Sequence, residues 1–244
     1  MKAMLLAAGR GSRLRPLTDH TPKALLRVAG EYLIERHLRR LAAVGVLDIV
    51  INLHHLGDQI ASALNGAPRS GARLHFLHEP TLLDTGGAIV NALPLLDDGP
   101  FILLSADVWT DYPLDRLLAP LPPATLARLV LVQSHLGADF GFASVPPPDV
   151  VAPLVMNPSE TFTYANLGVL DPALFRQAPA GAFPLRDLLF PALAAGRLAG
   201  ERYTGPWFNV GDLRELQALQ AFVGDREGDP AHGGLVANDD PADG

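Results

Sequence analysis

The chain has 244 residues, of which 48% are hydrophobic, so it is long enough to bury a sizeable core as one domain or two small ones. Its formal net charge of −7 argues against a general nucleic-acid or membrane-surface binder, because such proteins present a basic face. The absence of cysteine excludes disulfides, thiolate nucleophiles and cysteine-based zinc sites.

The first half of the chain alternates between short apolar runs and amphipathic stretches. The runs predict strands over 2–8, 47–53, 72–78 and 100–107. The amphipathic stretches predict helices over 33–44, 57–64 and 86–96. This alternation favours a parallel sheet covered by helices on both faces. The first run is shorter than a signal-peptide core, and no apolar stretch approaches the ~20 residues of a membrane helix, so we expect a cytoplasmic protein.

The pattern changes at about residue 126. Further strands are predicted over 126–134, 139–145 and 162–171, and helices over 185–195 and 212–223. The stretch 224–244 is polar, acidic and rich in Gly, Pro and Asp, which predicts a disordered acidic tail. We therefore expect one domain over residues 1–223.

A glycine-rich loop with the sequence "GRGSRLRPLTDHTPK" follows the first strand. Such a turn in an α/β sheet typically cradles phosphate, because backbone N–H groups point inward and glycine allows close approach. The alternative is a tight turn with solvated arginines. The nearby cations, Arg10, Arg13, Arg15 and Lys23, favour an oligophosphate ligand. The spacing fits neither a Walker A loop nor the dinucleotide fingerprint.

The whole segment "LAAGRGSRLRPLTDHTPKALLRVAG" resembles the signature of sugar-1-phosphate nucleotidyltransferases. The segments "DTGGAIVNALPLL", "FILLSADVWTDY", "FTYANLGVL" and "YTGPWFNVGDLRELQALQ" follow in that family's order, so the resemblance covers residues 1–223. Within the family, "HTPKALLRVAG", "LDTGGA" and "DVWTDY" are most similar to N-acetylmuramate-1-phosphate uridylyltransferases.

The resemblance implies a Rossmann-like, mostly parallel mixed sheet flanked by helices, the nucleotide-diphospho-sugar transferase fold. It divides the domain into a nucleotide-binding half, 1–125, and a sugar-binding half, 126–223. It implies that Arg13 draws off the leaving pyrophosphate and that Lys23 bridges the α-phosphate and the sugar phosphate. The nucleotide contacts that it implies are Ala8, Gly9, Gly11, Ser12, Arg13, Lys23, Glu79 and Gly86.

A carboxylate ends the predicted strand 100–107. The carboxyl end of a parallel strand is where α/β sheets place ligands, and Asp107 there suits Mg²⁺. The resemblance makes Asp107 a metal ligand and a catalytic residue. The family's second metal ligand is an aspartate in W-x-D-V-G, where this chain has Asn209. Either Asn209 ligates through a neutral oxygen, or the metal rests on Asp107 and the phosphates. Asp212 either compensates or caps the last helix.

The remaining candidates concern the base, the sugar and zinc. The resemblance places Ser105, Asp139 and Asn166 at the sugar, and Gly86 near the base, where a helix N-terminus is the alternative reading. His75 and His78 cannot converge on zinc, because residues three apart on a strand point to opposite faces.

The sequence therefore predicts a Mg²⁺-dependent transfer of a nucleotide from a triphosphate, UTP above all, to a sugar 1-phosphate, N-acetylmuramate 1-phosphate above all. Alternatives are mannose-1-phosphate guanylyltransferase, another sugar- or choline-phosphate nucleotidyltransferase, and a non-catalytic nucleotide-sugar sensor or regulatory subunit. The expected partners are the two substrates, without nucleic acid or membrane, in a monomer or small homo-oligomer.

Overall fold

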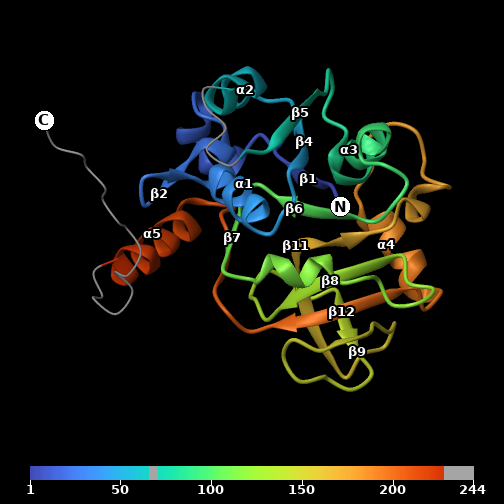
Figure 1. Ribbon diagram of the computed structural model, residues 1–244. Helices are drawn as coiled ribbons and strands as arrows, with labels where there is room; N and C mark the ends of the chain where they lie inside the picture. Colours follow the sequence, from blue (N-terminus) through green and yellow to red (C-terminus); the bar gives the residue numbers. More distant parts are fainter. Residues whose placement is uncertain (66–70, 228–244) are drawn as a thin grey trace, which may run out of the picture.

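The computed structural model describes residues 1–65 and 71–227 (Figure 1). Most of the predicted tail, 228–244, lies outside these residues. The structure corrects the start of that tail, because the last helix, α5, spans Leu213–Glu227 and so continues past residue 223. Arg226 explains the extension: its guanidinium pairs with the Asp111 carboxylate and lies over the Phe222 ring.

A central sheet organises the chain, and nine of the described strands belong to it. One half is parallel and lies in the order β6 (Phe101–Ser105), β1 (Ala3–Leu6), β4 (Asp48–Leu53) and β5 (Arg73–His78). The other half continues from β6 through β11 (Glu160–Leu170), β8 (Ala127–Val132), β12 (Leu198–Tyr203) and β10 (Val151–Pro153), with β9 (Phe140–Phe142) paired to β11. Because β11 runs antiparallel to both β6 and β8, the sheet is mixed.

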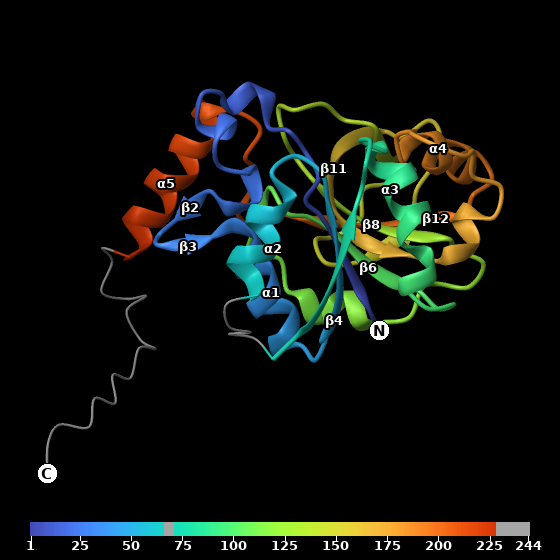
Figure 2. The same cartoon turned by 90° about the horizontal axis from the view of Figure 1, so that it is seen from above.

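Helices cover both faces of this sheet (Figure 2). The helices α1 (Leu33–Ala43) and α2 (Gly57–Asn65) pack on one face, where Ile34, Leu41 and Ile60 are fully buried. The helices α3 (Asp84–Ala92) and α4 (Arg186–Ala194) pack on the other face, where Ile89 is fully buried. The two-sided cover explains why the parallel strands read as continuous apolar runs.

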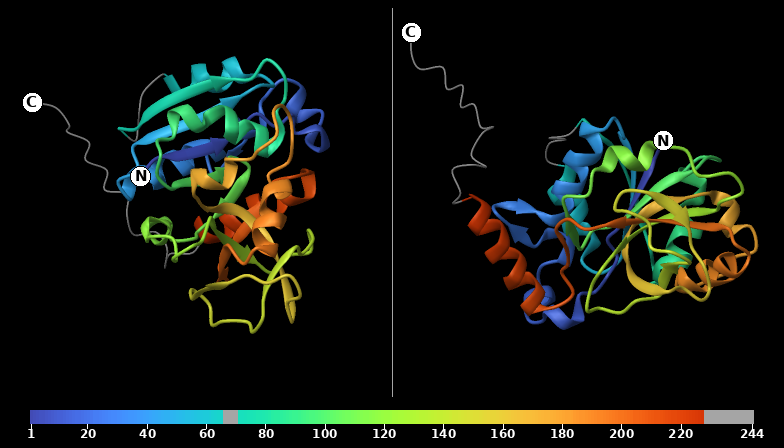
Figure 3. Two further views of the ribbon diagram at one scale, coloured as in Figure 1. Left: turned by 90° about the vertical axis from the view of Figure 1, so that its right-hand side faces the viewer. Right: turned by 90° about the horizontal axis from the view of Figure 1, so that it is seen from below.

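A third apolar cluster lies beside the sheet, where α5 packs against a hairpin near the N-terminal glycine loop (Figure 3). The elements around it are β2 (Arg27–Val28), β3 (Glu31–Tyr32), β7 (Val108–Thr110) and β13 (Trp207–Asn209). Its buried core, here called the α5 cluster, consists of Leu14, Leu26, Val28, Leu33, Trp109, Val210, Leu216 and Leu219. It joins the last helix to the loop that follows the first strand.

Short 3₁₀ helices complete the fold at Ser12–Leu14, Leu17–Asp19, Lys23–Leu25, Leu93–Leu95, Leu114–Leu118 and Pro172–Phe175. No helix of residues 1–65 or 71–227 combines the length and apolarity needed to cross a bilayer. The predicted α/β class and the mostly parallel mixed sheet are confirmed.

Candidate active site

Two adjoining cavities open at the carboxyl ends of the parallel strands. The first, here called the β1 cavity, encloses about 520 Å³, and its lining includes Ala8, Gly9, Lys23, Glu79 and Asp107. The second, here called the β11 cavity, encloses about 480 Å³ and is lined by residues of β11, β13 and α4. Leu6, Asp84, Thr85 and Ser105 line both, so the cavities meet at the ends of β1 and β6. This is where α/β sheets bind ligands.

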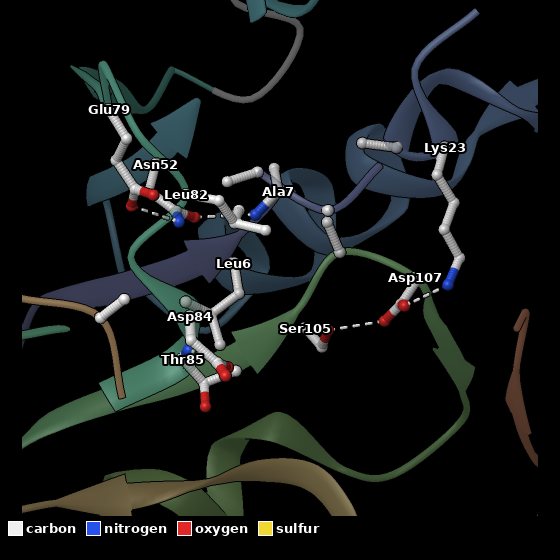
Figure 4. A pocket seen from close by; sticks show the side chains of 15 residues that line it. Leu6, Ala7, Lys23, Asn52, Glu79, Leu82, Asp84, Thr85, Ser105 and Asp107 are labelled. Atoms are coloured by element: carbon white, nitrogen blue, oxygen red, sulfur yellow. Dashed lines mark hydrogen bonds and ion pairs between the residues drawn. The ribbon is translucent and has the colours of Figure 1, made fainter. Parts of the chain in front are cut away.

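Lys23 and Asp107 form an ion pair in the β1 cavity (Figure 4). Asp107 also accepts a hydrogen bond of 2.6 Å from the Ser105 hydroxyl. Burial alone would raise the pKa of Asp107, but the charge of Lys23 and the hydrogen bonds from Lys23 and Ser105 outweigh it and hold that pKa below its ordinary value. Asp107 is therefore an anion at neutral pH, with its compensating cation beside it.

A chain of hydrogen bonds lies on the opposite side of the same cavity (Figure 4). The Ala7 N–H donates to Asn52 Oδ1 at 2.8 Å, and Asn52 Nδ2 donates to Glu79 Oε1 at 2.8 Å. Glu79 also accepts from the Leu83 N–H at 3.3 Å, and only 4% of Glu79 is exposed. Both donors, the Asn52 amide and the Leu83 N–H, are neutral. Glu79 therefore presents to the cavity a buried carboxyl group that acts as a hydrogen-bond acceptor.

The glycine loop is divided between the cavity wall and the neighbouring surface. Ala8 and Gly9 line the β1 cavity, whereas Gly11, Ser12 and Arg13 do not. Gly11 has φ +62°, and a Cβ there would lie 2.8 Å from Thr18 Cγ2, so this turn requires glycine. Arg13 is exposed, and its guanidinium lies against Gly211 beside the end of β13.

The side chain of Arg15 braces the loop locally. Its guanidinium forms an exposed ion pair with Asp19 at 3.0 Å, one helical turn later. Arg15 therefore belongs to the loop's own structure and not to the lining of either cavity.

Of the two interpretations of Gly86, a contact near the base and a helix N-terminus, the structure shows the helix N-terminus. Gly86 does not line the β1 cavity; its N–H donates to the Phe183 carbonyl at 2.8 Å, and a Cβ would meet the Phe183 ring at 2.2 Å. The missing side chain of Gly86 thus allows the loop before α4 to pack against the N-terminus of α3. The neighbouring residues Asp84 and Thr85 face the cavities instead.

The β11 cavity brings together the three residues predicted to contact the sugar, Ser105, Asp139 and Asn166. Asn166 has φ +57° and lies where the pairing of β11 with β8 shifts register, so a β-bulge turns it toward the cavity. Tyr164 lines the same cavity, and its buried hydroxyl oxygen has no hydrogen-bond partner among the described residues.

Asn209 lies on β13, whose ladder with β7 begins next to Asp107. It pairs with Val108 in the β13–β7 ladder, and the Val210 N–H donates to the Asp107 carbonyl at 2.9 Å. The Asn209 Oδ1 atom is buried and unpartnered among the described residues, and Asn209 lines the β11 cavity. An orphaned amide oxygen, on a segment whose backbone is bonded to that of Asp107, fits a hard cation that completes its shell with phosphate oxygens and water.

Other acidic and histidine candidates have structural roles. Asp212 Oδ1 accepts from the Arg214 and Glu215 N–H groups, so Asp212 caps α5. His75 and His78 approach different carboxylates, those of Asp48 and Asp58, at 3.6 and 3.9 Å. In the part of the chain that the structure describes, no group of three or more histidine or acidic side chains could hold a metal.

Sequence reasoning missed several residues of the two cavities. Asn52 carries the link between Glu79 and the first strand, and its signal was a lone polar residue inside the apolar run "IVINL". Outside the two cavities, Asp111 pairs with Arg36 on α1 and with Arg226 on α5. Arg186, at the start of α4, lines the β11 cavity, and no sequence pattern marks it.

Comparisons with known proteins agree with this geometry. A family model described as nucleotidyl transferase matches residues 2–226. The chain is 40% identical over 229 residues to the N-acetylmuramate alpha-1-phosphate uridylyltransferase of Neisseria meningitidis serogroup B, covering 92% of this chain and 99% of that protein. It is 31% identical over 239 residues to the protein of the same name from Caulobacter vibrioides, covering 90% of this chain and 95% of that protein.

Solved structures share the fold. A putative glucose-1-phosphate thymidylyltransferase from Bacillus anthracis superposes with a TM-score of 0.77 at 20% identity, covering 98% of both chains. A UDP-glucose pyrophosphorylase from Acinetobacter baumannii gives 0.75 at 18% identity, covering 95% of both chains. These likenesses show the nucleotide-diphospho-sugar transferase fold. With the family match along most of its length, the chain belongs to the nucleotidyl transferase family.

Proposed function

We propose that the protein transfers UMP from UTP to N-acetylmuramate 1-phosphate, releasing pyrophosphate and UDP-N-acetylmuramate. Lys23 carries this proposal, because its ammonium lies in the β1 cavity, and its partner Asp107 is bonded to Ser105, a residue of both cavities. A cation at this position would touch both anionic reactants. The two relatives at 40% and 31% identity supply the substrate names.

The reaction needs no covalent enzyme intermediate. An oxygen of the sugar phosphate attacks the α-phosphorus of the triphosphate in line, a P–O bond forms, and the bond to pyrophosphate breaks. The attacking oxygen is already anionic, so no general base has to remove a proton. The work of the protein is to orient two anions and to stabilise the charge that develops on the α-phosphate oxygens. Lys23 is placed for the second task.

We propose that Asp107 and Asn209 hold Mg²⁺ when the substrates are bound. Bound Mg²⁺ would neutralise phosphate charge. The fit rests on the Asp107 carboxylate, on the unpartnered Asn209 Oδ1, and on the backbone hydrogen bond from Val210 to Asp107 that links the two segments. Mg²⁺ commonly takes one or two protein ligands and completes its shell with phosphate oxygens and water. On binding, Lys23 would exchange its carboxylate partner for a phosphate.

Glu79 favours a base that presents a hydrogen-bond donor. Glu79 lines the β1 cavity, and its carboxyl oxygens already act as acceptors toward Asn52 and Leu83. Uracil offers N3–H, and cytosine, whose N3 is an acceptor, offers its 4-amino group, so UTP and CTP are compared directly in the panel below. Guanine also offers an N–H group, so the choice between UTP and GTP requires a direct measurement.

Pyrophosphate release from a substrate panel tests the proposal. UTP, GTP and CTP are each combined with the 1-phosphates of N-acetylmuramate, N-acetylglucosamine and mannose. We expect UTP with N-acetylmuramate 1-phosphate to give the highest kcat/KM. Preference for GTP with mannose 1-phosphate would instead support the activity named for a relative from Aspergillus fumigatus, 28% identical over 226 residues, covering 88% of this chain and 62% of that protein. No turnover with any pair would favour a sensor or regulatory subunit.

The remaining expectations belong to the same proposal. We infer that residues 1–125 bind the nucleotide and 126–223 the sugar, since the β1 cavity draws nearly all its lining from the first range and the β11 cavity draws on both. We also propose a cytoplasmic monomer or small homo-oligomer, because UTP and sugar phosphates are intracellular metabolites.

A further inference from the structure

Arg186 is the one cationic side chain among the residues that line the β11 cavity. The acidic residues of that lining are Asp84 and Asp139. Arg186 is exposed, and no ion pair or hydrogen bond joins its guanidinium to any residue of the described ranges. A cation facing a ligand cavity without a protein counterion is available to an anionic group of the ligand.

The backbone that carries Arg186 is fixed in place. The Leu185 N–H donates to Thr85 Oγ1 at 2.8 Å, and the Phe183 carbonyl accepts from the Gly86 N–H. Phe183 and Leu185 are buried, with 6% and 5% exposed. The residue before Arg186 is thus bound to α3, whose first residues line both cavities, so the Cα of Arg186 is held at the rim of the β11 cavity.

The other polar groups of the cavity suit neutral parts of a sugar. Tyr164 lines the cavity, and burial raises the pKa of its hydroxyl above its ordinary value, so this group stays neutral. The Asp139 carboxylate accepts from hydroxyl or amide N–H groups. Both acidic residues of the lining repel an anion, so an anionic substituent on the sugar needs the one cation that the lining provides.

We propose that Arg186 is a specificity-determining residue that binds a carboxylate on the sugar, distinct from the phosphate that reacts near Lys23. The inference rests on the proposed function and deepens it. N-acetylmuramate differs from N-acetylglucosamine by a lactyl ether whose carboxylate is attached through a different ring carbon from the 1-phosphate. The substrate therefore has two separate anionic groups, and the two cavities offer Lys23 and Arg186 as separate cations.

The test compares two sugar phosphates that differ only in the lactyl group. For Arg186→Ala we expect the KM for N-acetylmuramate 1-phosphate to rise about tenfold, with kcat little changed, because a charge-assisted hydrogen bond is lost. The inhibition constant of N-acetylglucosamine 1-phosphate, measured as a competitor, should stay at the parent value. Arg186→Lys should lie between parent and Arg186→Ala, since lysine keeps the charge and loses the planar fork.

Arg176→Ala is the matched control, because Arg176 is exposed and lines neither cavity. Equal changes for both sugar phosphates in Arg186→Ala, or no change for either, would overturn the role of Arg186 while the activity of the parent stands. A parent protein that releases no pyrophosphate from UTP and N-acetylmuramate 1-phosphate would overturn the proposed function itself, whatever the variants do.

Discussion

At the scale of single residues, the proposed chemistry depends most on the pair formed by Lys23 and Asp107. Lys23 comes from the 3₁₀ helix Lys23–Leu25, and Asp107 from the turn between β6 and β7. Each neutralises the other, with 13% and 26% of their side chains exposed. Partial burial strengthens electrostatic interactions at this point, and two anionic substrates can replace the carboxylate as partners of the lysine.

Lys23→Ala should lower kcat far more than it weakens triphosphate binding. A preorganised charge aimed at the transition state is worth about 10²–10³ in rate. Steady-state kinetics at saturating substrates measure the effect. Arg15→Ala serves as the control, since Arg15 is a cation of the same loop whose exposed partner is Asp19. A near-normal kcat in Lys23→Ala would place the lysine outside the reaction centre.

Asn209 should set the magnesium requirement. A carboxylate there adds one negative charge beside Asp107, and hard divalent cations favour charged oxygens. Asn209→Asp should therefore lower the Mg²⁺ concentration for half-maximal rate, and Asn209→Ala should raise it, because the unpartnered Oδ1 is removed. Asp107→Ala should be the most impaired. Magnesium titrations at fixed triphosphate compare the four proteins; identical curves for the parent and both Asn209 variants would exclude Asn209 from the metal.

At the scale of elements, α1 supports the ribbon that follows Asp107. His37 on α1 is fully buried, and its Nε2–H donates to the Val108 carbonyl at 2.7 Å. Its Nδ1 atom is buried without a partner among the described residues. Arg36 and Arg40 of the same helix also donate to carbonyl groups of the β7 segment, both to that of Thr110. The helix thereby fixes the backbone next to the reacting groups.

His37 should make stability depend on pH. Burial lowers its pKa from 6.5 to about 4; the hydrogen bond to Val108 and the charge of Asp107 oppose this, and the charges of Arg40 and Arg36 add to it. At a pH between these two pKa values, His37 binds a proton in the unfolded chain but not in the folded chain. The free energy of unfolding therefore falls as the pH is lowered from 6.5 to 4, by on the order of 3 kcal/mol.

Urea denaturation between pH 4 and 8 measures this contribution of His37. His37→Gln should lose that part of the pH dependence, whereas His135→Gln should keep it, because 83% of the His135 side chain is exposed. An unchanged pH profile in His37→Gln would mean that other groups cause the acid sensitivity.

Local pattern was enough to predict most elements of the parallel half. The apolar runs at 47–53 and 72–78 match β4 and β5 within one residue, because buried parallel strands carry their signal in consecutive side chains. The hairpin β2–β3 was missed, since two-residue strands have no period. The role of Gly86 depends on Phe183, a partner far along the chain, and no local pattern around either residue contains that contact.

The site was predictable to a similar degree. Two segments that resemble the family, "LAAGRGSRLRPLTDHTPKALLRVAG" and "FILLSADVWTDY", predicted Lys23 and Asp107, and the structure brings these two residues together. Arg186 had no signal in the sequence, and the lone polar Asn52 did not reveal its bond to Glu79, because such residues acquire a role only when the sheet order places them at a cavity. The same reason explains why Gly86, inside a familiar motif, lies under a phenylalanine ring and not at the cavity wall.

At the scale of the whole molecule, the last helix supports the first loop. The α5 cluster joins Leu216 and Leu219 of α5 to Leu14 of the glycine loop and Val210 beside Asn209. Trp109 is packed edge-on against Phe222 at 5.6 Å between ring centres. The helix α5 therefore packs against both segments. Leu14 belongs to the loop beside the β1 cavity, and Val210 follows the candidate metal ligand Asn209.

Leu219→Ala should therefore damage both stability and triphosphate binding. Leu219 is fully buried, and truncating such a leucine costs about 2–5 kcal/mol in the free energy of unfolding. The cavity left behind loosens Leu14, which lies between Arg13 and Arg15, so the KM for UTP should rise as well. Leu117→Ala is the matched control: Leu117 is equally buried, belongs to the cluster between the sheet and α1, and lies outside both cavities. Urea denaturation and initial rates compare the two variants at a temperature where both are folded. Similar losses of stability with a raised KM only in Leu219→Ala would establish that α5 holds the glycine loop in place, whereas equal KM values would limit α5 to stabilising the fold.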